Sequence, residues 1–320
     1  MSLASDPVPS GDLAGDVSVR DSAPLLSGNA LAAVSMMLFA AGFPAADMLL
    51  RDWSPIFLIA IRLAMALALL IPLWAMMDGW GAVRRANWLR GVWVGGIGFG
   101  SATYLLLLAQ WMTDPITVAL FATTAPLCAT LIEVLNKQRR LTRNFVLGLI
   151  ASIIGGVIAT GGNLSAELGW GVGMTVLAGL GFSWASNQAV RDFPTLSAVG
   201  RSTITFAGAG LFTGTALGVA YVAGMDVMPH SAITGAQLGN LAIYAIAAMA
   251  LSQILFIASV GKIGVALTTF HINLVPFYVM IILLSLGGEW NWMKATGAGV
   301  VCIGVLISQM PARRVKPAYV

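Results

Sequence analysis

Long apolar runs alternate with short polar segments along the whole chain. A helix needs about 20 predominantly apolar residues to cross the hydrocarbon core of a bilayer, and ten runs approach or exceed that length. The pattern therefore predicts an all-α polytopic membrane protein with ten transmembrane helices. The expected spans are residues 29–49, 55–77, 87–111, 115–136, 144–161, 168–190, 194–223, 237–260, 265–286 and 291–310.

The composition agrees with a membrane protein. The 320 residues are 58% hydrophobic and 9% charged, with a mean hydropathy of +0.87, whereas about 25% of the residues in a soluble domain are charged. The connections between the runs are short and leave no room for a soluble catalytic domain. Residues 1–28 are polar and are predicted to be a disordered tail, and residues 311–320 a basic cytoplasmic tail.

Positive charges gather in alternate connections, which predicts the orientation of the chain. With the N-terminus in the cytoplasm, most Lys and Arg residues fall on the cytoplasmic side, and only Arg51 and Lys294 lie outside. Both termini are therefore expected in the cytoplasm. The basic residues are scattered over separate loops, so the pI near 9.3 reflects this topology and no nucleic-acid partner is expected.

The two halves of the chain repeat the same spaced residues. Pro55 and Arg62 correspond to Pro194 and Arg201, and in each pair the Arg follows the Pro by seven residues. Shortly before these prolines Asp52 corresponds to Asp192, and further along Tyr104 corresponds to Gln253 and Pro126 to Pro276. Five spans in each half, an odd number, require opposite insertion of the halves. The sequence therefore predicts two inverted repeats, residues 29–161 and 168–310. Such repeats place a transport site at their interface.

The ending of the second half carries a family resemblance. Pro276 is followed by Gly287-Gly288-Glu289-Trp290-Asn291-Trp292, then Gly297-Ala298-Gly299 and Gly304, whereas a basic cluster at residues 137–140 replaces the acidic turn in the first half. The arrangement resembles the drug/metabolite transporter (DMT) superfamily, in its ten-helix branch with paired EamA-type halves. Within that branch it is similar to aromatic amino-acid exporters. The resemblance implies a multi-pass protein of the bacterial inner (plasma) membrane that works by alternating access.

Polar and aromatic residues on the helices that enclose the central cavity in this family form the predicted substrate-binding set. Aromatic walls with neutral hydrogen-bonding groups suit a zwitterion that carries an apolar side chain. The alternative for each residue is an ordinary hydrogen bond between helices. Pro126 and Pro276, at matching places in spans four and nine, are expected to be hinges or static kinks. The set is Tyr104, Thr123, Thr124, Trp184, Asn187, Gln253, His271, Asn273 and Tyr278.

Charged groups within the predicted spans are few. Asp47 and Glu133 lie within about a turn of a span end, and the absence of a midplane carboxylate argues against the common proton-antiport design. His271 lies deep in a span and, with Asp47 and Glu133, is a candidate for proton coupling; a neutral His lining the cavity is the alternative. Arg62 and Arg201 are expected to snorkel or to bond helix-end carbonyls, with substrate carboxylate binding as the alternative.

Enzymatic motifs and metal clusters are missing from the sequence. Cys128 and Cys302 lie within apolar runs and are expected to be buried thiols, neither a disulfide nor metal ligands. Ser183 has Trp184 where a serine nucleophile motif requires Gly, so no enzyme is expected.

The predicted function is the export of small amphipathic metabolites, above all aromatic and other neutral amino acids, by a facilitative mechanism. The expected partners are the solute and the lipid bilayer, and the chain is expected to act as a monomer or homodimer without a cofactor or metal. The alternative is a proton-coupled multidrug or organic-cation exporter of the same superfamily.

Overall fold

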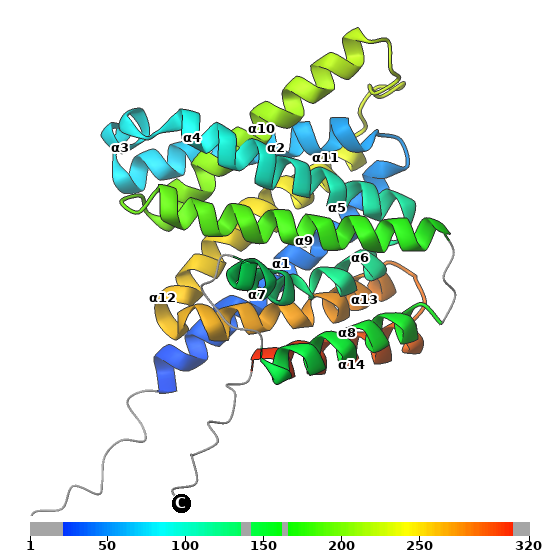
Figure 1. Cartoon of the computed structure of the whole chain (residues 1–320). Coiled ribbons are helices and arrows are strands. Elements are labelled where there is room, and N and C mark those ends of the chain that lie inside the picture. The colour runs from blue at the N-terminus through cyan, green and yellow to red at the C-terminus, as the bar shows by residue number, and fades with distance from the viewer. Residues whose placement is uncertain (1–21, 136–141, 162–165, 310–320) are drawn as a thin grey trace, which may run out of the picture.

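The computed structural model describes residues 22–135, 142–161 and 166–309, and all the regular structure in these ranges is helical. Most helices run alongside one another, and α8 and α14 form a pair along the lower edge of the bundle (Figure 1). The elements are α1 Ser22–Leu50, α2 Pro55–Asp78, α3 Trp80–Arg85, α4 Trp88–Trp93, η1 Val94–Gly100, α5 Ser101–Met112, α6 Pro115–Ala122, α7 Ala125–Leu135, α8 Arg143–Ala159, α9 Ala166–Asp192, α10 Ala198–Val222, α11 Gly235–Ala242, η2 Ile243–Leu251, α12 Ser252–Phe270, η3 His271–Leu274, α13 Val275–Ser285 and α14 Trp292–Gln309.

Seven helices of the described chain are long and apolar enough to cross a membrane. They comprise residues 25–50, 55–78, 88–112, 115–132, 168–189, 198–222 and 235–256, and shorter apolar helices cover residues 143–159, 271–285 and 292–308. Each predicted span overlaps one of these helices. The polytopic all-α architecture therefore agrees with the sequence, while ten crossings and cytoplasmic termini stay predictions.

Two helix boundaries differ from the predicted ones. α1 begins at Ser22, within the predicted tail; Ser259 on α12 donates a hydrogen bond to the carbonyl of Gly28 at 2.9 Å. The predicted gap at residues 261–264 is absent, since α12 continues to Phe270 and η3 follows it directly. Residues 1–21 of the predicted N-terminal tail and the whole C-terminal tail lie outside the described residues.

Side-chain caps begin several helices where the sequence places small polar residues. Ser54 caps α2 and Thr142 caps α8, each accepting a hydrogen bond from the backbone N–H three residues ahead. Thr234 and Gln237 form a reciprocal capping box at the start of α11. Ser197 caps α10, so this helix begins after the turn that follows Pro194 and not at the proline itself.

Close helix packing depends on glycines in two places. A Cβ at Gly95 on η1 would clash with the backbone carbonyl of Thr205 on α10, and a Cβ at Gly148 on α8 would clash with the Gly304 carbonyl on α14. Small residues let helix backbones approach in this way. On α10, by contrast, Gly214 and Gly218 have open space around them.

Two clusters of buried side chains meet along α1. The first joins α1, α2 and the α11–η2 segment around Leu49, Leu58 and Tyr244. The second joins α1 to α6 and α13 around Phe43, Val118 and Val279. α1 is therefore a central element of the bundle, and the helices that carry the predicted site residues are arranged around it.

Candidate transport site

Four interruptions of helical geometry occur within the apolar helices. The π-helical segments η1 and η2 precede α5 and α12, at places that the predicted repeat pairs with each other. A turn at Thr123–Thr124 separates α6 from α7, and the 3-10 segment η3 precedes α13. Within a membrane such backbone is tolerated where it is buried in protein or lines a cavity, and π-helical segments are frequent at functional sites. The interruptions therefore mark the candidate site.

The two predicted hinge prolines adjoin two of these interruptions. Pro126 is the second residue of α7 and Pro276 the second residue of α13. In the first turn of a helix the missing N–H of proline leaves no hydrogen bond unmade. Each proline therefore stands at the start of a helical segment next to an interruption, and whether it kinks its span stays a prediction. Their role as hinges stays a prediction.

The hydroxyls of the α6–α7 turn bond locally. Thr123 is 1% exposed and donates to the Leu120 carbonyl at 2.6 Å, while Thr124 donates to the Phe121 carbonyl at the same distance. The same two carbonyls also accept hydrogen bonds from the backbone N–H groups of Thr123 and Thr124, so the hydroxyls add a second bond to each carbonyl at the end of α6. Thr124 also lines a cavity of about 380 Å³ among α7, α8 and α9, whose walls are almost entirely apolar.

The predicted residues on α5, α9 and α12 lie beside the π-helical segments. Tyr104 packs against the first core cluster, and the ring of Trp184 lies against Gly98 of η1. The Nε2 of Gln253 donates to the Ser202 hydroxyl on α10 at 3.2 Å. This is a hydrogen bond between helices, the alternative to substrate binding for this residue. Asn187 is partly buried on α9.

The η3–α13 region holds the three remaining predicted residues. Asn273 is 6% exposed, and its side-chain oxygen is buried with no hydrogen-bond partner among the described residues. Its backbone carbonyl accepts a contact from the Cys302 thiol at 3.1 Å. His271 is partly buried on η3, and Tyr278 packs against the second core cluster.

The structure does not gather the predicted set around one cavity that it describes. Tyr104 and Tyr278 pack against different core clusters, which share α1. Of the set, only Thr124 lines the 380 Å³ cavity, and none lines a second cavity of about 360 Å³ at the Asp114 end of the bundle.

The predicted proton-linked acids are peripheral where the structure describes them. The Asp47 carboxylate lies 3.7 Å from the Arg51 guanidinium, one turn further along α1, and its side chain is 36% exposed. The side chain of Glu133 lies outside the described residues. Cys128 and Cys302 are free thiols, Cys128 buried and Cys302 partly buried.

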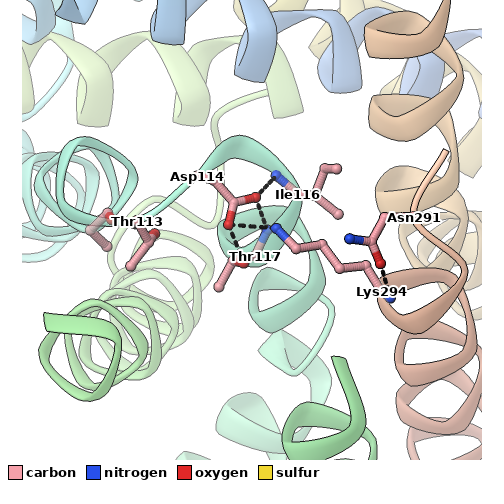
Figure 2. A network of polar contacts seen from close by, with 7 residues as sticks. Thr113, Asp114, Ile116, Thr117, Asn291 and Lys294 are labelled. Carbon is pink, nitrogen blue, oxygen red and sulfur yellow. Dashed lines mark hydrogen bonds and ion pairs between the residues drawn. The ribbon is translucent and has the colours of Figure 1, made fainter. Parts of the chain in front are cut away.

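Asp114 and Lys294 form a polar network that the sequence analysis did not identify (Figure 2). The Lys294 ammonium on α14 lies 2.7 Å from the Asp114 carboxylate, which also caps α6 through the N–H groups of Ile116 and Thr117. Burial by itself would raise the pKa of Asp114, but Lys294 and the hydrogen bonds from Thr117 outweigh it and lower that pKa below its ordinary value. The sequence does carry a signal for the capping role of Asp114, because an Asp directly before a proline is typical of a helix start.

The two matching arginines have different environments. Arg201 donates to the carbonyls of Phe193 and Pro194 at 2.8 and 2.9 Å, as predicted for helix-end carbonyls. Arg62 neither snorkels nor bonds helix-end carbonyls. It is 8% exposed, and its guanidinium carbon lies 3.8 Å from the ring centre of Tyr244 on η2. The Arg62 side chain therefore extends into the bundle instead of snorkelling to the interface.

Comparisons with known proteins find a similarity of fold over most of the chain and a family similarity in its first half. No curated protein sequence matches. A solved crystal structure, described only as that of a protein, matches with a TM-score of 0.63 and 19% sequence identity over 92% of this chain and 100% of its own, a likeness of fold alone. The model of the EamA-like transporter family matches residues 26–161. The similarity to this transporter family therefore covers residues 26–161, somewhat less than half of the chain.

Proposed function

We propose that this chain is a membrane transporter that exports small amphipathic metabolites, chiefly aromatic and other neutral amino acids, by alternating access. The observation that carries the proposal is the set of paired helix interruptions, η1 with η2 and the Thr123–Thr124 turn with η3. They occur in a chain whose residues 26–161 match a transporter family, and transporters build substrate sites from interrupted helices near the membrane midplane.

Contacts between the two halves support a repeat-built transporter. α9 packs against η1 and α5, and α1 correspondingly packs against η2 and α12. α9 also packs against α6 and α7, and α1 against α13. α1 and α9, which are equivalent in the predicted repeat, thus each pack against helices of the other half. In this arrangement one repeat can rock against the other, which is how repeat-built transporters achieve alternating access.

A facilitative mechanism fits the placement of the titratable groups. Asp47 and Asp114 lie near helix ends and pair with Arg51 and Lys294. A proton antiporter would instead need an acid that meets both proton and substrate at the centre of the bundle. Of the other predicted proton-linked residues, His271 is partly buried on η3 and the side chain of Glu133 lies outside the described residues.

The test is counterflow and efflux of radiolabelled phenylalanine, tryptophan, methionine and threonine in proteoliposomes, with and without an imposed pH gradient. Saturable downhill movement that ignores the gradient is expected, and protein-free liposomes are the control. Uphill movement driven by protons would instead support a multidrug-type antiporter. The variant His271→Gln is expected to keep transport in the absence of a gradient, and its complete loss in inserted protein would revive proton coupling.

A further inference from the structure

Arg62 is a charged side chain buried in the bundle without a counter-ion. Among the described residues, no carboxylate lies within ion-pair distance of its guanidinium, and its Nε is enclosed without a hydrogen-bond partner. It stands about 10 Å along α2 from the first residue of that helix. A buried charge without a counter-ion is costly in free energy. We therefore expect an anionic group to pair with Arg62 during the function of the protein.

The neighbours of Arg62 leave its Nε without a hydrogen-bond partner. The guanidinium carbon lies 3.8 Å from the ring centre of Tyr244, a cation–π contact, and Tyr244 also shares a side-chain hydrogen bond with the guanidinium. Leu58, Ile59 and Leu63 of the same helix are buried and apolar. A guanidinium with an unpartnered donor in apolar surroundings matches a carboxylate, which supplies both a hydrogen-bond acceptor and the opposite charge.

The Arg62–Tyr244 pair also lies beside a predicted substrate residue and a helix interruption. Tyr104 packs against the same core cluster, and Tyr244 is the second residue of the π-helical segment η2. We propose that Arg62 binds the carboxylate of the transported solute, and that Tyr244 positions its guanidinium for this contact. The inference rests on the proposed transport function and adds a requirement to it: the solute carries a carboxylate.

The repeat-equivalent arginine provides a matched control. Arg201 already donates to two backbone carbonyls, from Phe193 and Pro194, and its Nε, the atom that is unpartnered in Arg62, is one of the two donors. Removing either arginine deletes one positive charge from a corresponding helix. Only removal of Arg62 is expected to change recognition of a carboxylate.

The experiment compares acids with their amides. Purified full-length protein is tested by thermal shift and by competition with labelled phenylalanine counterflow, using phenylalanine, methionine, 3-phenylpropionate and the corresponding amides. In the wild type the acids are expected to bind at least tenfold more tightly than the amides. Arg62→Gln is expected to weaken binding of the acids tenfold or more and to abolish the preference, Arg62→Lys to restore part of it, and Arg201→Gln to retain it.

Each contrary outcome has a separate meaning. Equal binding of acid and amide by the wild type would overturn the carboxylate proposal without any variant, as would an undiminished preference in folded Arg62→Gln. Failure of every carboxylate to stabilise the protein would also overturn it. Arg62-dependent binding of carboxylates without amino-acid transport would keep the Arg62 site and reject amino-acid export.

Discussion

Arg90 and Asp192 form an ion pair, with the Arg90 Nε 2.8 Å from a carboxylate oxygen of Asp192, that joins the start of α4 to the end of α9. Asp52, which the predicted repeat pairs with Asp192, accepts a hydrogen bond from Gln237 at 2.9 Å. Arg90 and Gln237 are each the third residue of their helices, α4 and α11. The two contacts thus occupy corresponding places in the two halves. The first is an ion pair, and the second is a hydrogen bond from a neutral amide to a carboxylate.

The variant Arg90→Gln replaces the Arg90–Asp192 ion pair by a contact between a neutral amide and the Asp192 carboxylate, like the contact of Gln237 with Asp52. It is expected to cost at most about 1 kcal/mol of stability, because the Arg90 side chain is 41% exposed and ion pairs in water contribute little. Hydrogen exchange of the segment 190–197 should become faster. Arg84→Gln, at an exposed residue of α3, is the control. Equal exchange in both variants would show that the ion pair does not hold α9 to α4.

The Asp114–Lys294 pair predicts a pH dependence of stability. Because the folded pKa of Asp114 lies below its ordinary value of 3.8, its contribution is complete above that value and is lost as pH falls through the folded pKa. Asp114→Asn keeps a capping side chain and removes the charge, at an expected cost of about 1 kcal/mol near neutral pH. The difference in thermal stability between the two proteins, measured from pH 3 to 7, should narrow towards the acidic end. A constant difference across the whole range would contradict the assigned pKa shift.

Gly95→Ala is expected to be severe. The added Cβ would overlap the Thr205 backbone carbonyl, which belongs to a helix and cannot turn aside, so a loss of about 3 kcal/mol or more is expected. Gly214→Ala on α10, where nothing lies within 4 Å, should stabilise by about 0.5–1 kcal/mol through helix propensity. Melting temperatures of the two variants in the same detergent measure the contrast; similar values would refute the close packing of η1 on α10.

Trp184→Ala is expected to weaken transport of aromatic solutes without unfolding the protein. Loss of one aromatic contact of about 0.5–1.5 kcal/mol corresponds to a rise in KM of roughly threefold to tenfold. Trp170→Ala removes the same side chain from the same helix at a place where it is 67% exposed, and should leave KM unchanged. Equal KM values in the two variants would remove Trp184 from the site.

Pro276→Ala tests the predicted hinge. Alanine restores an N–H in the first turn of α13 and allows the helix to extend back through η3, so the maximal transport rate is expected to fall severalfold while stability changes by less than about 0.5 kcal/mol. Pro115→Ala begins α6 in the same way without an adjoining interruption and serves as control. Unchanged rates in Pro276→Ala would leave the proline a static helix start.

The length and placement of most helices are determined by the sequence itself. An apolar run near 20 residues has one stable structure in hydrocarbon, because a helix satisfies its own backbone. Caps such as Ser54 and polar breaks between runs therefore define many helix ends by local chemistry. The spacing of Arg62 and Arg201 after their prolines likewise indicates the paired halves, and residues 26–161 match a transporter family.

Only the tertiary structure decided what the buried polar groups contact. Arg62 and Arg201 stand in the same local sequence pattern, yet one stacks on Tyr244 and the other bonds two carbonyls. The Asp114–Lys294 pair likewise joins residues far apart in the chain, and the π-helical segments and the start of α1 at Ser22 were not predicted from the sequence. The physical reason is that lipid-buried polar atoms must find partners inside the protein, and the identity of those partners is set by packing between helices, which no local pattern encodes.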